Sequence, residues 1–267
     1  RKGEAVVSRN LQALDAALDH LMPLDPLACE RERLRDVLAL GKAVVVTGPQ
    51  HPKSPFYPPD LEPLPFNLAA AKALLAERGW KDEDGNGVLE RERDGQVEEF
   101  RFTAMVPNNP LFRPIFEIFK EDLDRIGVKV SLDFLNWKEF SQRLEARQFE
   151  CTALLWSGDG WESDLYQIWH SSQIDEVPSS NFIEFGDDEA DELIVTLRGT
   201  FEHEDRVRLQ RKLHKRIAAL QPYTFLLCFQ APLMFWPEKV GNVDAGIQYA
   251  TRPKIRYYPM AMRPAGR

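Results

Sequence analysis

Cysteine is scarce in this sequence, with only three in 267 residues. Three thiols cannot all pair within one chain, so we expect no disulfide framework. Cys151 and Cys228 lie in apolar, strand-like runs and are predicted to be buried thiols rather than reactive ones. The five histidines lack the spacing that brings two ligands onto one helix face, so no metal site is expected.

The chain also lacks an excess of positive charge and a long apolar run. Its net charge is −8, and no cluster of Lys and Arg is interleaved with aromatic residues, so nucleic acid is not an expected partner. No apolar run approaches the ~20 residues of a membrane span. The first residue is Arg1, with no charged-then-apolar leader, and we expect a processed chain or an excised piece.

The sequence motifs of common catalytic sites are missing as well. There is no Gly-x-Ser-x-Gly elbow, no Gly-x-x-x-x-Gly-Lys phosphate loop and no Gly-x-Gly-x-x-Gly after a strand. We therefore predict a protein that is not an enzyme and needs no cofactor. A pair of acids such as Asp159 and Glu162 would suit a glycosidase, which keeps a carbohydrate-active hydrolase as an alternative, although neighbouring acids in an acidic protein are usually solvated.

What the sequence does contain is a regular succession of strands and helices in its middle. Alternating apolar residues predict strands over 100–106 and 128–134, with an amphipathic helix over 115–126 between them. Asn136 caps a further helix that leads to an uncharged run, Cys151 to Trp156, predicted as a central strand buried on both faces. This order implies right-handed crossovers, an α/β fold and a mostly parallel central sheet flanked by helices.

The residues that follow these strands are the candidate binding site. Ligands of open α/β sheets gather beyond the carboxyl ends of parallel strands. Asp159 stands in a predicted turn after the central strand, with Trp156 and Trp161 beside it, and Asn108 and Asn109 follow an earlier strand. One carboxylate, two amides and two indoles suit recognition of an ammonium group, a sugar or apolar groups. The alternative is that Asp159 is only a turn residue.

An acidic turn precedes this region. Asp82, Asp84 and Asn86 match positions 1, 3 and 5 of a calcium-binding EF-hand loop and Gly87 matches position 6, but position 12 is Arg93 rather than glutamate. We therefore predict a polar turn that leads into a strand, without a metal ion.

The flanking regions differ in character. Seven prolines between Gly48 and Phe66 predict an extended segment along a surface. Helices are predicted over 187–199 and 203–220, followed by a buried strand, Tyr223 to Phe229, and a strand-rich C-terminal tail.

Many of these residues together resemble the second lobe of the family 5 extracellular solute-binding proteins, the peptide, nickel and oligosaccharide receptors of ABC importers. The matching segments run in order from residue 58 to residue 223 and are Pro58-Asp60-Leu61, Pro65-Phe66-Asn67, Ala71 to Glu77, Gly79-Trp80, Asp84 to Leu89, Asn109-Pro110, Ile126 to Val130, Asn136-Trp137 with Phe140, Trp156 to Asp159, and Leu220 to Tyr223.

This resemblance implies a lobe of the type II periplasmic-binding-protein-like fold and a receptor that binds a small solute, most simply a peptide. It implies a permease partner and a location outside the cytoplasm, in the periplasm or anchored at the outer face. The Asp of the family's Trp-x-x-Asp motif, which pairs with a peptide amino terminus, maps onto Asp159, and the tryptophan maps onto Trp156. Arginines that read a peptide carboxylate are missing, because Val106-Pro107-Asn108 precedes Asn109 and residue 153 is alanine.

The chain is too short for a whole member of that family, so we expect an N-terminal lobe to be missing. Residues 1–222 are predicted to form the second lobe, and 223–267 a return strand and tail that would normally join the first. A ligand-sensing domain of a regulator with the same fold is the other open interpretation of the resemblance.

Overall fold

The computed structural model describes residues 43–93, 95–110, 112–158, 162, 164–229 and 255–262. Its strands are β1 (Ala43–Val45), β2 (Glu90–Arg93), β3 (Gln96–Glu99), β4 (Arg101–Pro107), β5 (Lys129–Leu135), β6 (Cys151–Ala153), β7 (Trp156–Gly158), β8 (Tyr223–Phe229) and β9 (Ile255–Met262). Its helices are α3 (Leu68–Glu77), α4 (Phe112–Asp124), α5 (Trp137–Glu145), α6 (Tyr166–Trp169), α7 (Asp188–Gly199) and α8 (His203–Leu220), with a 3₁₀ turn, η1 (Ser171–Gln173).

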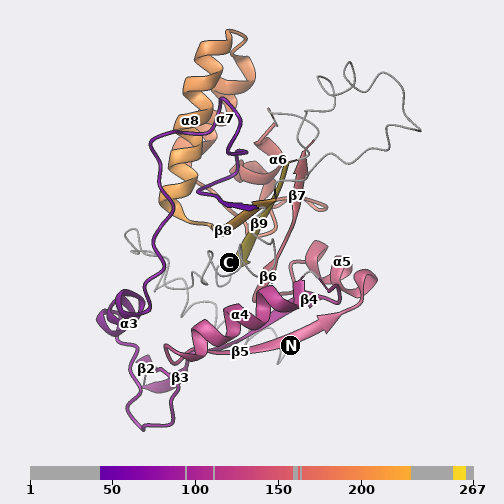
Figure 1. Ribbon diagram of the computed structural model, residues 1–267. Coiled ribbons are helices and arrows are strands. Elements are labelled where there is room, and N and C mark those ends of the chain that lie inside the picture. The colour runs from indigo at the N-terminus through magenta and orange to yellow at the C-terminus, as the bar shows by residue number, and fades with distance from the viewer. Residues whose placement is uncertain are drawn as a thin grey trace, which may run out of the picture.

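A seven-stranded sheet forms the centre of the molecule, in the order β1-β8-β9-β6-β4-β5, with β7 paired to β9 (Figure 1). The predicted α/β class is confirmed, and β5, β4 and β6 are parallel as expected from their helical crossovers. The pairings of β9 with β6, β7 and β8, and of β1 with β8, are antiparallel. The sheet is therefore mixed. The sequence did not predict the antiparallel pairings, because apolar periodicity identifies a strand without specifying its direction.

Alternation along β4 explains how helices cover both faces of the parallel part. Phe102, Ala104 and Val106 belong to the cluster that includes α4, and the Phe102 ring lies 6.3 Å from that of Phe119. Met105, one residue out of phase, packs with Phe140 of α5. Since successive strand side chains point to opposite faces, α4 and α5 lie on opposite sides of the sheet.

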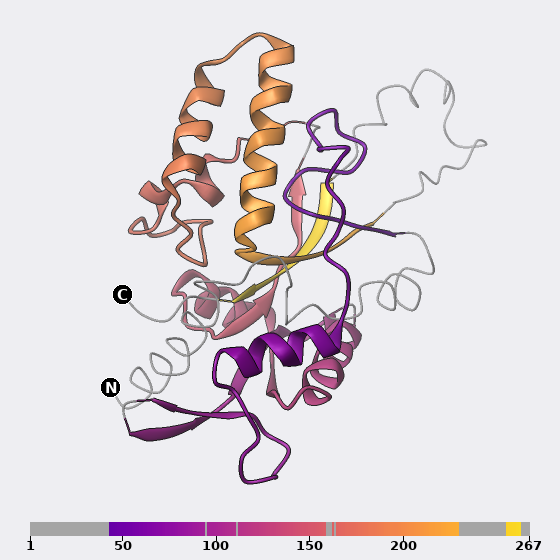
Figure 2. The same cartoon turned by 90° about the vertical axis from the view of Figure 1, so that its left-hand side faces the viewer.

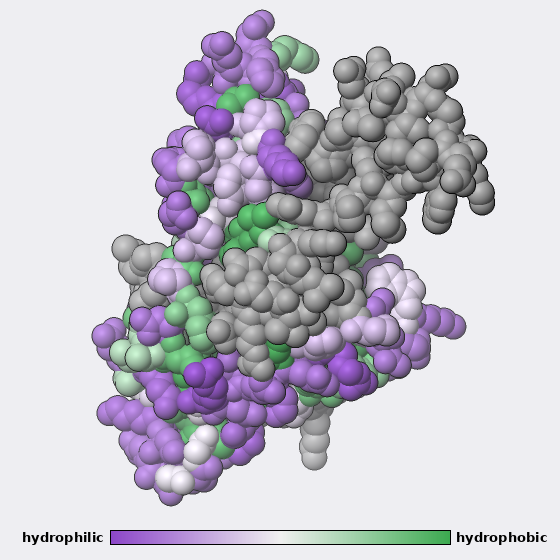
Figure 3. Space-filling model, in the orientation of Figure 1, coloured by the Kyte–Doolittle hydropathy of each residue, from purple (hydrophilic) through white to green (hydrophobic). Residues whose placement is uncertain are grey.

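The other half of the sheet supports the helix pair α7 and α8. Tyr223 and Phe225 of β8 pack in one buried cluster with Trp169, Ile194 and Leu213 from the three helices α6, α7 and α8. Figure 2 shows α7 and α8 side by side at one end of the molecule, with α3, α4 and α5 at the other. Seen as a surface, hydrophobic side chains gather between these two hydrophilic ends (Figure 3).

The predicted strand from Cys151 to Trp156 is a central strand, but it is interrupted. β6 and β7 both pair with β9, and their partners, Met260 for Ala153 and Tyr257 for Trp156, belong to one continuous register. In that register Pro259 stands opposite Leu154. The interruption therefore lies opposite a proline, which has no N–H to donate to a neighbouring strand.

Other predictions are confirmed locally. Asn67 caps α3 by accepting a hydrogen bond from the Ala70 N–H at 3.0 Å, and α7 and α8 begin and end within a residue of their predicted bounds. Cys151 and Cys228 are buried free thiols, and burial raises the pKa of the Cys151 thiol well above its ordinary value. The predicted strand-rich tail contains β9, while residues 230–254 lie outside the described part of the chain.

Residue 222, where the sequence predicts one lobe to end, does not mark a break in the sheet. β8 follows it directly and pairs with β9, which in turn pairs with β6 of the preceding segment. The assignment of 223–267 to another lobe stays a prediction, and what the structure shows is one continuous hydrogen-bonded sheet.

The packing of α4 on the sheet gives a test of the core. Phe119→Ala is expected to lower the free energy of unfolding by about 3–5 kcal/mol, because the ring is fully buried between Phe102 and Phe116. Phe201→Ala, at a ring that is 89% exposed, is the matched control and should change stability by less than about 0.5 kcal/mol. Chemical denaturation followed by circular dichroism measures both, and equal losses would contradict this packing.

Candidate functional site

The site predicted at the carboxyl ends of the parallel strands starts with the loop after β4. Asn108 and Asn109 are both exposed there. The Asn108 N–H donates to the Leu135 carbonyl at 2.7 Å, which ties this loop to the end of β5. The Phe112 N–H donates to the Asn109 carbonyl at 3.1 Å, so α4 begins at this edge with the positive end of its dipole. The geometry presents two amide side chains beside a helix N-terminus.

Trp137 is an aromatic residue at the same edge that the site prediction omitted. It is 70% exposed and stacks on Phe140 with ring centroids 5.6 Å apart. It follows Asn136, whose side chain caps α5 by accepting from the Glu139 N–H at 3.0 Å. In the sequence, Trp137 contributes only to the family resemblance. It was not predicted as a site residue, because a tryptophan in the first turn of a helix is equally consistent with burial.

Arg113 brings a positive charge to this edge. Its guanidinium lies 3.9 Å from the centre of the Phe134 ring, and it pairs loosely with Glu117 at 3.8 Å. No arginine stands directly before Asn109, where the family resemblance implies one. The structure places this arginine four residues after it, in the first turn of α4.

Trp156, the tryptophan of the predicted site, lies half-buried in β7. Its ring stacks on Phe182 with centroids 6.0 Å apart and planes 20° apart. Its indole Nε1 is buried and finds no hydrogen-bond partner among the residues that the structure describes. An unpaired buried donor is costly, so this N–H is a candidate to donate to a bound molecule.

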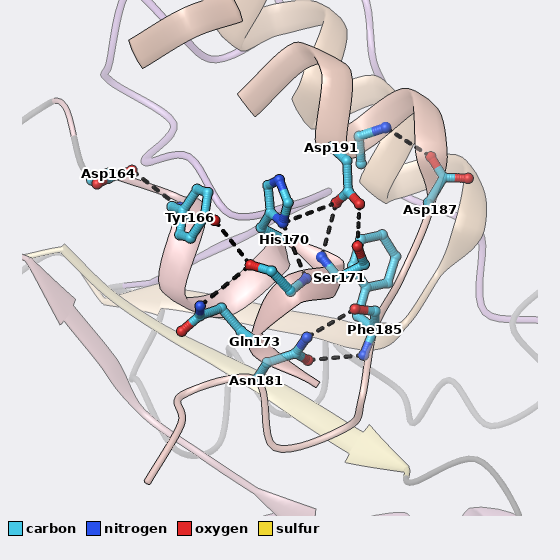
Figure 4. A network of polar contacts seen from close by, with 11 residues as sticks. Asp164, Tyr166, His170, Ser171, Gln173, Asn181, Phe185, Asp187 and Asp191 are labelled. Carbon is cyan, nitrogen blue, oxygen red and sulfur yellow. Dashed lines mark hydrogen bonds and ion pairs between the residues drawn. The ribbon is translucent and has the colours of Figure 1, made fainter. Parts of the chain in front are cut away.

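A polar network holds the segment that carries Phe182. The Asn181 side chain bonds both to the Phe185 carbonyl and to the Phe185 N–H, each at 2.8 Å. Ser171 donates to Asp191 of α7 through its N–H and its hydroxyl, as Figure 4 shows. These contacts fix the connection between β7 and α7, and with it the surface on which Trp156 stacks.

Asp159 and Trp161, the other two predicted site residues, lie outside the described residues, and their ligand role stays a prediction. The strand before them ends at Gly158. The segment after them is held at Glu162, whose Oε1 accepts from Arg206 and, at 3.0 Å, from Gln210 Nε2, both on α8. Glu162 is therefore part of a structural ion pair.

The support behind Glu162 continues into the proline-rich segment. Gln210 accepts a hydrogen bond from Gln50 Nε2, and the Gln50 N–H donates to His214 Nδ1 at 3.4 Å. With Nδ1 accepting, Nε2 carries the proton and donates to Thr47 Oγ1 at 2.9 Å. The extended segment thus lies along α8, as Figures 1 and 2 show.

Burial determines the charge of His214. The side chain is fully buried, and loss of solvent lowers its pKa from its ordinary value to about 3, so it is neutral at physiological pH. Gly48 lies against it so closely that a Cβ there would come within 2.6 Å of Nε2. Glycine at 48 is required by this approach.

The sheet and its helical layers resemble solved structures, and this similarity identifies the class of fold. The oligopeptide-binding protein AppA from Bacillus subtilis, solved in complex with a nonapeptide, matches the structure with a TM-score of 0.67 at 26% identity, over 96% of this chain and 43% of AppA. DppA from Helicobacter pylori, solved in complex with the peptide STSA, gives a TM-score of 0.63 at 18% identity, over 98% of this chain and 41% of DppA. The fold is the type II periplasmic-binding-protein-like α/β fold, as predicted.

The sequence then identifies the family. Residues 26–176, more than half of the chain, match the bacterial extracellular solute-binding proteins, family 5 Middle. The chain belongs to this family, which confirms the predicted resemblance. AppA of Bacillus subtilis (strain 168) is 30% identical over 206 residues, and the dipeptide-binding protein of Escherichia coli (strain K12) is 23% identical over 168 residues.

The chain spans about a third of the length of these two relatives. The aligned stretch covers 74% of this chain but 36% of AppA, and 61% of this chain but 29% of the Escherichia coli protein. Within the described ranges, none of the helices combines the length and the apolar character that crossing a bilayer requires.

The buried histidine gives a pH test of the support behind the site. His214 takes up a proton at an ordinary pKa near 6.5 when unfolded but only near 3 when folded, so the unfolded state binds more protons between these values. Stability is therefore complete above about pH 7 and falls as the pH is lowered, by about 2 kcal/mol at pH 5. Urea unfolding at several pH values measures it.

His214→Gln is the comparison, since glutamine keeps a donor and an acceptor but does not titrate. This variant should be less stable at pH 7 and should lose less stability between pH 7 and pH 5 than the wild type. Parallel curves for the two proteins would contradict a neutral, buried His214.

Proposed function

We propose that this chain is part of a receptor that binds a peptide without transforming it and delivers it to the permease of an ABC importer. Family membership supports the class of protein, since the family consists of extracellular solute-binding proteins. Relatives whose names and structures specify peptides, such as AppA with its nonapeptide, support the class of ligand. The receptor would work outside the cytoplasm, in the periplasm or anchored at the outer face.

The observation that carries the proposal is the composition of the edge beyond β4, β5 and β7. Asn108 and Asn109 offer exposed amides that suit the backbone of an extended peptide, and Trp137 offers an exposed indole face. Arg113 lies at the same edge and suits a carboxylate. Asp159, two residues after Ser157 in β7, is proposed to pair with the ammonium group of the peptide.

A second lobe is proposed to supply the opposite wall of the site. Since the chain covers 36–43% of AppA, most of the length of such a receptor is contributed by other segments. A ligand held between two lobes loses about half of its contacts when one is absent, so this chain alone should bind weakly. Hinge closure of the two lobes around the peptide would hold it for delivery to the permease.

The state of Glu162 supports binding rather than catalysis. A glycosidase needs two carboxylates with one of them able to donate a proton to the leaving group. Glu162 is instead held by hydrogen bonds from Arg206 and Gln210, which orient its carboxylate toward α8. We therefore propose that the protein is not an enzyme.

Native mass spectrometry of the full-length protein, purified from the cells that make it, tests the ligand class. We expect a retained mass that fragments into a peptide series. A retained sugar or metal complex, with no peptide, would overturn the peptide assignment.

The role of Asp159 is tested by substitution in the same full-length protein. Asp159→Asn should weaken the binding of the identified peptide by about 30-fold or more, because the buried ammonium group would lose its counter-charge, worth about 2 kcal/mol. Asp164→Asn is the matched control: it removes an exposed charge nearby while keeping an acceptor for the Tyr166 N–H. Isothermal titration calorimetry measures both variants, and equal affinities would show that Asp159 is only a turn residue.

An assay of glycoside hydrolysis tests the absence of catalysis. Wild type, Asp159→Asn and Glu162→Gln are expected to share one background rate. Turnover that either substitution abolishes would replace the receptor with a hydrolase.

A further inference from the structure

We infer that the loop between Lys81 and β2 binds a divalent cation with oxygen ligands, for which calcium is the best fit. The inference concerns a part of the molecule away from the proposed peptide site and does not depend on it. In Figure 1 this loop belongs to the β2-β3 end of the molecule, far from α7 and α8.

Three carboxylates converge in this loop. Asp82, Asp84 and Glu90 each bring an oxygen within 4.8 Å of the others. Over the described ranges, none of the three forms an ion pair with a lysine or arginine. Like charges at this separation repel one another, and a bound cation would reverse the sign of that interaction.

Glu90 is the residue that distinguishes this cluster from an ordinary acidic turn. It is only 8% exposed, and its Oε1 accepts from the N–H groups of Glu83 and Asp84 at 2.8 and 3.1 Å, which directs the carboxylate into the loop. Its Oε2 is buried and has no hydrogen-bond donor in the described part of the chain. A buried carboxylate oxygen without a donor is expensive, and a cation at the centre of the loop would satisfy it.

The backbone holds the carboxylates in place before any ion arrives. Lys81 and Glu90 close the loop with two hydrogen bonds between their main chains, at 3.0 and 2.7 Å. Inside it, the Gly87 N–H donates to Asp82 Oδ2 and the Asn86 N–H to Asp84 Oδ1, each at 3.0 Å. The ligands are therefore largely preorganised, so binding costs little ordering.

The spacing of the acidic residues explains why the sequence predicted no metal ion in this loop. Counted from Asp82, the twelfth position is Arg93, which excludes the bidentate glutamate of an EF-hand. Glu90 is the ninth position, which in EF-hands often acts through a water molecule. Here β2 begins at that residue and buries it, so the ninth position replaces the twelfth as the last carboxylate.

The ligand set favours calcium over other divalent ions. All three ligands in the cluster are carboxylate oxygens, with no His or Cys among them, which disfavours zinc and copper. Calcium accepts irregular oxygen shells, whereas magnesium requires near-octahedral geometry and gives up its water reluctantly. We expect a dissociation constant of about 10⁻⁴–10⁻³ M, as in extracellular calcium modules.

Terbium luminescence with the whole chain, freed of metal by a chelator, is the first experiment. Trp80, two residues before Asp82, is placed to sensitise a bound terbium ion. We expect luminescence that millimolar calcium displaces, and a melting temperature a few degrees higher in calcium than in magnesium or in chelator. No displaceable luminescence and no shift at 5 mM calcium would overturn the inference.

Charge-removing variants then locate the ion. Glu90→Gln keeps an acceptor for the Glu83 and Asp84 N–H groups, and Asp84→Asn changes an exposed residue, so both should fold. Each is expected to weaken calcium binding at least tenfold. Glu83→Gln removes an exposed charge from the same loop outside the cluster and should bind calcium as the wild type does; equal binding by all three variants would place the ion elsewhere and overturn the assignment.

Discussion

The backbone pairing of β9 is the constraint on which the rest of the structure depends. This strand lies between β8 and β6 and also pairs with β7, so it joins the antiparallel half of the sheet to the parallel half. Helices α7 and α8 pack on the first half, and α4 and α5 on the second. Without β9, each half would present an unpaired edge, and unsatisfied buried backbone groups are among the most costly defects in a protein.

Both halves of the sheet hold described residues that flank the candidate site. The edge with the exposed amides and indole belongs to β4, β5 and the starts of α4 and α5. The strand that leads to Asp159 pairs with β9, and the segment after it is tied at Glu162 to Arg206 and Gln210 of α8. Binding groups on loops are held best when both ends of the loop are fixed to regular structure, and here both ends are.

Local patterns predicted the elements well and their assembly less well. Periodicity predicted the bounds of α7 and α8, and the Asn67 cap predicted the start of α3. The crossover rule predicted that β4, β5 and β6 run parallel to one another. The interruption between β6 and β7 could not be predicted locally, because Pro259, which stands opposite it, lies about a hundred residues further along the chain. For the same reason, nothing near Glu90 in the sequence indicated that β2 would bury it.

The sequence indicates the position of some candidate residues and not of others, for physical reasons that differ between residues. The end of a strand can be predicted from a sequence, so Asn108, Asn109 and Trp156 could be named as candidates, and their ligand role stays a prediction. The exposure of a side chain cannot be predicted in the same way, because a tryptophan such as Trp137 is usually buried. The packing of α5 in the structure shows that the Trp137 ring faces solvent. Arg113 lies four residues after Asn109, and the family resemblance implies an arginine only before it.

The central position of β9 also has a consequence for the order in which the molecule can fold. It comes later in the sequence than every strand that it joins, so a chain emerging from the ribosome completes β4, β5, β6 and β8 while the place between them is still vacant. Long-range pairings of this kind are slow to form, and open strand edges attract other chains meanwhile. The sheet is therefore completed only when the last described strand pairs with β8 and β6.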